Sequence, residues 1–221
     1  MVRKRIVLLH ATQVSFEPIH SAFDRLWPEA ELVNLLDDAL TLDRSRASEL
    51  SPDLIERFLE LARYGFRLGA DGILVTCSAF GPAIERAAAE LPVPVLKPNQ
   101  AMFEAALTHG ERIGMLSTFF PSTASMENEF IEAAAQSGSQ ARLTAIDVPE
   151  AIDSLRRGDV ATHNRILSEY ALQLTNMDAV MLAQFSASRA AEAVRCVIGC
   201  PVLTAPEAAV LKMRSAVLGA G

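Results

Sequence analysis

Short apolar runs alternate along the chain with longer stretches in which apolar residues recur every three or four positions. The short runs are predicted to be β-strands and the longer stretches helices, a pattern typical of parallel sheets with crossover helices. Residues 71–76 and 178–183 are apolar nearly throughout, as expected of strands that are covered on both faces. The predicted strands are residues 5–9, 32–36, 72–76, 93–96, 112–116, 143–148, 178–183 and 200–203.

Helix starts are marked by capping residues and prolines. Ser51 followed by Pro52 predicts an N-cap with proline in the first turn. Further helices are expected to begin near Pro82, Ser122 and Asp159. The histidines expected on helix surfaces are His20, His109 and His163.

The second half of the chain repeats the first. A shift of 107 residues carries Asp71 onto Asp178 and other strand-like positions onto matching ones, without a break in register. Internal repeats indicate repeated architecture, so the fold class is α/β, with two similar parallel-sheet lobes. The sequence repeat spans residues 1–107 and 108–214, and the predicted lobes are residues 1–98 plus 206–221 and residues 99–205.

The composition limits the classes of partner that the protein is expected to bind. Half of the 221 residues are hydrophobic and the net charge is −7, which argues against nucleic acid or an anionic membrane surface as a partner. No apolar run approaches the roughly 18 residues of a membrane span. Three cysteines, an odd number, without a recognisable secretion signal predict reduced thiols and a cytoplasmic protein.

Cys77 is the main chemical candidate. It directly follows the strand at residues 72–76, and a helix is expected shortly after it. Open α/β sheets bind ligands at the carboxyl ends of strands, where backbone N–H groups and the helix dipole favour an anion. The same field is expected to lower the pKa of the thiol, so Cys77 can act as a base, a proton donor or a nucleophile. The alternative is a small buried residue that closes the strand.

The 107-residue shift carries Cys77 onto Gln184. An amide cannot shuttle protons at neutral pH, but it can donate a hydrogen bond to a carboxylate or enolate oxygen. Gln184 is therefore predicted to face a ligand, the alternative being a satisfied polar residue at a strand end. Cys196 and Cys200 are expected to pack, because two thiols without neighbouring histidines make a poor zinc site.

Polar residues also follow the first strand of each copy and are expected to reach the same crevice. Thr12 and Gln13 follow the first copy's strand, and Ser117 and Thr118 end the corresponding strand of the second copy. Lys97 ends the strand at 93–96, where its cation is expected to hold a substrate carboxylate or a Cys77 thiolate. Loop capping or solvent exposure is the alternative for each. Four rings near these positions suggest an apolar or aromatic substituent on the ligand, unless they belong to the core: Phe80, Phe119, Phe120 and Phe185.

Five stretches together point to a known family. They are TCSAFGP (76–82), KPN (97–99), IGMLSTFFPS (113–122), MLAQFS (181–186) and CPVLTAPEAAV (200–210). In this order they resemble the aspartate/glutamate/hydantoin racemase superfamily, which includes maleate isomerase and arylmalonate decarboxylase. The resemblance implies two lobes related by a pseudo-twofold axis, an active site in the cleft between them, and no metal or organic cofactor.

The resemblance also implies residue roles. The family's racemases use two cysteines, one on each face of the substrate's acidic carbon. Cys77 matches the first, whereas Gln184 stands where the second would fall, and a single base would return the proton to the face it left. In maleate isomerase the first cysteine acts as a nucleophile on the double bond. Ser78, Ser117 and Thr118 match positions that hold carboxylate or enolate oxygens.

These observations predict a cofactor-independent isomerase- or racemase-like enzyme that acts on a small carboxylic acid through Cys77. A decarboxylase of a malonate-type acid and a non-catalytic carboxylate-binding protein are the alternatives. The chain is compatible with a homodimer or a higher homo-oligomer.

Overall fold

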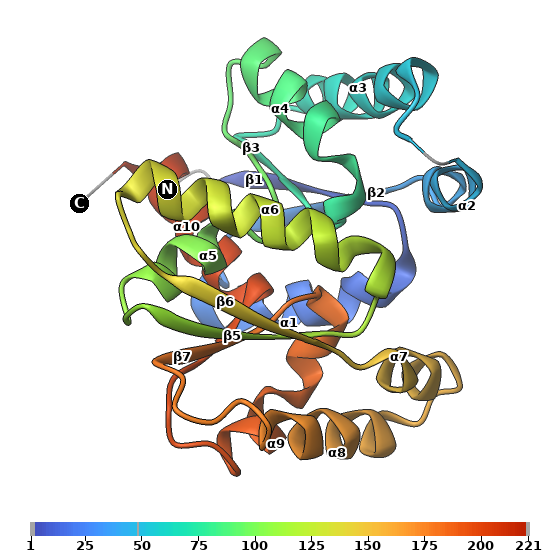
Figure 1. The fold of residues 1–221 in the computed structure, drawn as a ribbon. Helices are drawn as coiled ribbons and strands as arrows, with labels where there is room; N and C mark the ends of the chain where they lie inside the picture. Colours follow the sequence, from blue (N-terminus) through green and yellow to red (C-terminus); the bar gives the residue numbers. More distant parts are fainter. Residues whose placement is uncertain (1–2, 48, 220–221) are drawn as a thin grey trace. The chain divides into compact units, whose positions relative to one another are not determined.

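The computed structural model describes residues 3–47 and 49–219. Within these ranges the chain forms two parallel four-stranded sheets with helices beside them (Figure 1). The chain divides into two compact units: unit 1 is Met1–Pro98 with Ala209–Gly221, and unit 2 is Asn99–Ala208. The α/β fold class with two lobes that the sequence predicts is confirmed.

Unit 1 has the strand order β2-β1-β3-β4. Its strands are β1 (Arg5–His10), β2 (Glu31–Leu36), β3 (Gly72–Val75) and β4 (Val95–Leu96). Its helices are α1 (Phe16–Leu26), α2 (Ala39–Arg46), α3 (Pro52–Arg67) and α4 (Gly81–Glu90), with short 3₁₀ helices η1 (Gln13–Ser15) and η2 (Ser78–Phe80). Ser51 caps α3 as predicted, because its hydroxyl accepts a hydrogen bond from the N–H of Leu54.

Unit 2 repeats the order as β6-β5-β7-β8. Its strands are β5 (Arg112–Ser117), β6 (Arg142–Asp147), β7 (Ala179–Leu182) and β8 (Val202–Thr204). Its helices are α5 (Gln100–Leu107), α6 (Phe120–Ser137), α7 (Pro149–Arg156), α8 (Val160–Ala171), α9 (Ala191–Arg195) and the 3₁₀ helix η3 (Phe185–Ala190). Helix α10 (Ala205–Leu218) begins in unit 2 and ends in unit 1.

The strand registers of the two units are related by a shift of 107 residues. Ile6 pairs with Gly72 in unit 1, and Ile113 pairs with Ala179 in unit 2. The β6 strand departs from this rule, because a shift of 111 relates Glu31, the partner of Arg5, to Arg142, the partner of Arg112. Unit 2 therefore has four more residues before this strand and four fewer after it.

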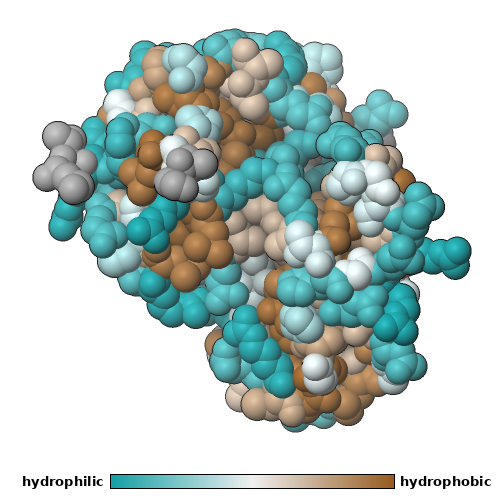
Figure 2. All heavy atoms as spheres, turned by 90° about the vertical axis from the view of Figure 1, so that its left-hand side faces the viewer, coloured by the Kyte–Doolittle hydropathy of each residue, from teal (hydrophilic) through white to brown (hydrophobic). Residues whose placement is uncertain are grey.

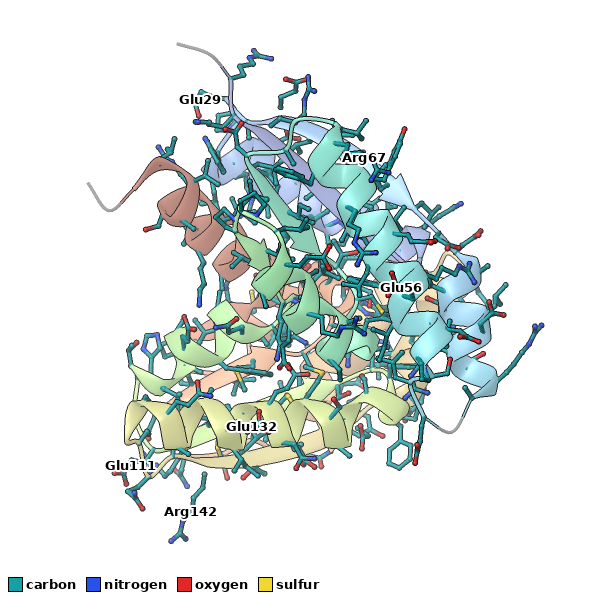
Figure 3. The ribbon with its side chains drawn as sticks, turned by 90° about the horizontal axis from the view of Figure 1, so that it is seen from above. Glu29, Glu56, Arg67, Glu111, Glu132 and Arg142 are labelled. Carbon is teal, nitrogen blue, oxygen red and sulfur yellow. The ribbon has the colours of Figure 1, made fainter. Side chains whose placement is uncertain are left out.

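A carboxylate fastens the amino end of each sheet. Asp71 accepts a hydrogen bond of 2.8 Å from the backbone N–H of Arg5, and Asp178 accepts one of 2.9 Å from that of Arg112. Hydrogen bonds from Arg112 lower the pKa of Asp178 to about 2. Glu111 and Arg142 lie side by side at this end of unit 2 (Figure 3), where the N–H of Arg142 donates to the carbonyl of Glu111.

The face drawn in Figure 2 is mixed, with hydrophobic patches interrupted by hydrophilic side chains. Among the described residues, no helix is both long enough and apolar enough to cross a membrane.

Candidate active site at the strand ends

Cys77 lies at the carboxyl end of β3, which runs between β1 and β4 and is buried along its whole length. Phe80 holds the turn that follows, because its fully buried ring stacks on that of Phe58 with 5.5 Å between the centroids. Cys77 itself is partly exposed and packs against the same apolar cluster. The chain thus presents the thiol at the strand end where open α/β sheets bind ligands.

The pKa of the Cys77 thiol is raised, and the sequence-based expectation of a lowered pKa is wrong. Desolvation by the surrounding apolar side chains is the largest cause, and it outweighs two opposing effects. The backbone N–H of Ala79 bonds to the sulfur, and the positive charge of Arg44 favours the thiolate. The thiol therefore carries its proton at neutral pH and, before a ligand binds, is better prepared to donate a proton than to remove one.

Arg44 is a candidate site residue that the sequence analysis did not identify. It lies on α2, which follows the carboxyl end of β2, and the hydroxyl of Thr41 ties this helix to the carbonyl of Ala11 after β1. The Nη1 atom of Arg44 donates to the carbonyl of Ala47 at 2.8 Å. Its Nε atom is buried and has no hydrogen-bond partner among the described residues. A cation with an unused buried donor near the thiol is suited to bind a carboxylate.

Lys97 is the cation that the sequence analysis favoured. Its Nζ atom forms an ion pair of 2.6 Å with Oε1 of Glu85 on α4. The charge that acts on the pKa of Cys77 comes from Arg44 instead. A role for Lys97 in binding a substrate would require this ion pair to open.

Three further predicted site residues of unit 1 keep their side chains available. Ser78 begins η2 next to Cys77, and Thr12 and Gln13 follow β1. Ser78 and Thr12 are partly exposed and Gln13 is exposed. Within residues 3–47 and 49–219, none of the three uses its side chain in a hydrogen bond. All three can therefore contact a ligand without breaking an existing interaction.

Gln184, at the end of β7, is hydrogen-bonded through both ends of its amide. Its oxygen accepts from the backbone N–H of Thr118 at 2.8 Å and from the Thr118 hydroxyl at 3.1 Å. Its nitrogen donates to the hydroxyl oxygens of Ser117 at 3.0 Å and Ser122 at 3.3 Å. The backbone N–H of Thr118 can only donate, so the orientation of the amide is fixed.

The hydrogen bonds that link Gln184 to Asp147 are all donated in one direction, toward the carboxylate of Asp147. Thr123 donates its proton to the carboxylate of Asp147, so the 2.7 Å bond between Ser117 and Thr123 must use the Ser117 proton. Ser117 in turn accepts from Gln184. Ser117 and Thr118 are fully buried. A ligand contact by Ser117, Thr118 or Gln184 would have to replace a hydrogen bond that already exists.

Replacing Gln184 by leucine should destabilise the protein. The substitution leaves the buried N–H of Thr118 without an acceptor, and an unsatisfied buried group costs about 1–3 kcal/mol. Urea unfolding followed by circular dichroism measures the change. The exposed Gln173, substituted in the same way, is the control and should change the free energy of unfolding little. Equal effects of the two substitutions would show that the Gln184 hydrogen bonds contribute nothing.

Burial distinguishes the remaining candidate residues that belong to the core from those at the surface. Phe80 and Phe185 belong to the core, whereas Phe119 and Phe120 are 39% and 69% exposed. Cys200 packs against the apolar cluster of unit 2, but Cys196 is exposed, contrary to its predicted packing role. In the described parts of the chain, no three His, Cys, Asp or Glu residues are grouped so that they could hold a metal ion.

Comparisons with known proteins agree on a family. The family model described as Asp/Glu/Hydantoin racemase matches residues 8–128 and 119–220. No curated protein sequence matches the chain.

Solved structures share the fold at low sequence identity. An aspartate racemase homologue from Pyrococcus horikoshii OT3 has a TM-score of 0.73 at 15% identity, covering 97% of this chain and 99% of that one. The allantoin racemase from Klebsiella pneumoniae has a TM-score of 0.68 at 19% identity, covering 97% and 88%. A mutant of arylmalonate decarboxylase in its sulfate-associated form has a TM-score of 0.65 at 14% identity, covering 98% and 94%.

Proposed function

The chain belongs to the Asp/Glu/hydantoin racemase family, and from this premise we propose that it is a cofactor-independent enzyme that moves a proton on a small carboxylic acid, with Cys77 as the proton-transferring residue. One observation carries the proposal. The strand end in unit 1 combines a thiol, a cation and unused polar side chains, whereas the corresponding strand end in unit 2 is an amide whose hydrogen bonds are already made.

The proposed roles follow from the chemistry of each group. Arg44 and Ser78 hold the substrate carboxylate, and Thr12 and Gln13 add hydrogen bonds to it. Electron density that develops on the carboxylate as an enediolate is stabilised by these donors. Gln184 has no proton to exchange at neutral pH, so we assign it no proton-transfer step and give it, with Ser117 and Thr118, a positioning role.

For an isomerase, the Cys77 thiolate takes a proton from the carbon next to the carboxylate, and the C–H electron pair moves into the enediolate. The thiol then returns the proton to another carbon of the same conjugated system. Two-base racemisation is disfavoured because the second proton donor is absent at Gln184. The Cys77 thiol must first lose its own proton to water to form the thiolate that this step requires, and the positive charge of Arg44 favours that thiolate.

A decarboxylase is the second candidate, and the raised pKa of Cys77 favours it. In that reaction the bond from the substrate carbon to a second carboxylate breaks, and carbon dioxide leaves. The electron pair stays as an enediolate, which the neutral Cys77 thiol protonates, and the thiolate recovers its proton from water. This order of steps uses the resting protonation state of the thiol.

Incubation with candidate acids in deuterated water tests the proposal. Proton NMR of aspartate, glutamate and phenylmalonate should reveal one compound that incorporates deuterium at carbon, because each catalytic cycle exchanges a proton through Cys77. Deuterium incorporation without release of carbon dioxide identifies an isomerase, and release of carbon dioxide identifies a decarboxylase. Acids that protect Cys77 from iodoacetamide but are never converted would identify a binding protein and contradict the proposal.

A further inference from the structure

A buried hydrogen-bonded group joins the carboxyl ends of β1, β2 and β3. His10, which is fully buried at the end of β1, lies at its centre. Its Nδ1 atom is 2.9 Å from the hydroxyl of Thr76 and 3.1 Å from that of Ser15, and its Nε2 atom is 2.9 Å from Oδ1 of Asn34. We call His10, Ser15, Asn34 and Thr76 the His10 cluster.

The protonation of this cluster follows from its partners. The amide oxygen of Asn34 can only accept, so the Nε2 atom of His10 carries a hydrogen. Desolvation lowers the pKa of His10 to about 4, and the hydrogen bond to Asn34 and the nearby His20 are smaller influences. The imidazole is therefore neutral at pH 7. Its Nδ1 atom must accept a hydrogen bond from a hydroxyl, and Thr76 is the nearer of the two donors.

The His10 cluster connects the two loops that carry the unit 1 site residues. Ser15 lies 2.9 Å from the hydroxyl of Thr76 and donates to the carbonyl of Thr12 at 3.0 Å. Thr76 is the residue before Cys77, and its backbone N–H is bound to the carbonyl of Leu9. The imidazole thus holds the start of the turn after β3 through Thr76, and the hydroxyl of Ser15, from the loop after β1, lies against both His10 and Thr76.

We infer that His10 is a positioning residue for Cys77, acting through Thr76 to hold the turn in which the N–H of Ala79 meets the thiol sulfur. The inference rests on the proposed function, because it is there that Cys77 is given its chemical role. A neutral imidazole can perform this task because it accepts and donates in fixed directions, whereas a leucine of similar bulk can do neither.

His163 provides a matched control. It is also a fully buried histidine whose pKa is lowered by desolvation, but it lies on α8 in unit 2 and its Nδ1 atom pairs with Asn164. His163→Leu removes a buried imidazole that makes fewer hydrogen bonds than His10, since the Nε2 atom of His163 has no partner among the described residues. The thermal midpoint of unfolding should fall for His10→Leu and change less for His163→Leu.

Alkylation of Cys77 by iodoacetamide, followed by mass spectrometry across pH, separates a positioning role from a purely structural one. In the unmodified protein the apparent pKa should lie above the ordinary thiol value of about 8.5. In His10→Leu the loosened turn admits water, so the apparent pKa should fall by about one unit, a tenfold change in the thiolate-to-thiol ratio. Protection by a bound acid should weaken as well. His163→Leu should leave both readouts unchanged.

Thr76→Val tests the same connection with a milder change, should His10→Leu fail to fold. It keeps the side-chain shape and removes the hydroxyl that donates to His10 and also contacts Ser15, and it should shift the alkylation profile in the same direction. An unchanged profile in either folded variant, or an equal shift in His163→Leu, overturns the inference. If the variants show the expected shift in the apparent pKa of Cys77, but no acid protects Cys77 of the unmodified protein from alkylation, the proposed function is contradicted and the inference about His10 is not.

Discussion

Replacing Cys77 by alanine should reduce turnover of the acid identified by deuterium exchange by about 10²–10⁴-fold, the usual contribution of a positioned general acid or base. The loss should appear in kcat, because the thiol acts on the reacting carbon and contributes little to holding the carboxylate. Cys77→Ser should be nearly as inactive, since a hydroxyl of similar size is a far weaker acid. The rates are measured by proton NMR in deuterated water.

Cys196→Ser is the control for these variants. Its thiol is exposed and lies in unit 2, so its removal should leave both kcat and stability unchanged. Urea unfolding of Cys77→Ala shows whether a lost rate reflects chemistry or folding. A correctly folded Cys77→Ser protein that keeps full turnover would remove Cys77 from the mechanism.

Replacing Arg44 by glutamine should weaken substrate binding by about 1.5–3 kcal/mol, the usual contribution of a hydrogen bond to a charged group. The effect should fall mainly on KM, because the guanidinium holds a carboxylate that is present throughout the reaction. The pKa of Cys77 should rise further, since the charge of Arg44 favours the thiolate. Initial-rate kinetics and the pH dependence of Cys77 alkylation measure the two effects.

Arg46, two residues further along α2, is the matched control. Its side chain is 76% exposed and forms a surface ion pair with Asp43, so Arg46→Gln should change KM less than about twofold. Equal changes in the two variants would indicate a general charge effect instead of a carboxylate contact. An Arg44→Gln protein with unchanged KM would exclude Arg44 as the carboxylate-binding residue.

The sheets could be predicted from the sequence because their strands are apolar runs separated by turn residues. The structure shortens some of them. The strand predicted at 93–96 pairs only as β4 (Val95–Leu96), since Pro94 has no N–H and contributes only its carbonyl, which accepts from Ile73. β7 begins at Ala179, one residue after the predicted start, although the N–H of Asp178 still donates to the carbonyl of Arg112.

Helix α2 escaped prediction because its apolar pattern is weak. Helix α2 has a single buried residue, Leu40, so residues 37–46 give no periodic signal. Arg44 lies on this helix and was missed for the same reason. Its position after β2 could have indicated a site residue, because the loops that follow parallel strands emerge at the same edge of the sheet as Cys77. His163, predicted on a helix surface, is buried against its neighbours. One polar residue on an apolar face is easily assigned to the wrong side.

The partners of Gln184 also lay beyond the reach of the sequence. Its position at a strand end was predictable from the repeat, and its polar character suggested a ligand contact. The hydrogen bonds to Ser117, Thr118 and Ser122 span more than 60 residues of chain. Such contacts depend on how adjacent strands align, which residue patterns along one strand do not encode.

The four-residue displacement of β6 relative to β2 changes which residues of the two units correspond in space. In unit 1, Leu36 of β2 pairs with His10 of β1, and in unit 2, Asp147 of β6 pairs with Ser117 of β5. The carboxylate that receives the chain of hydroxyl protons in unit 2 thus has an aliphatic counterpart in unit 1. The polar network of unit 2 thus ends in an anion, whereas that of unit 1 is centred on a neutral imidazole, a difference that an alignment with one constant offset conceals.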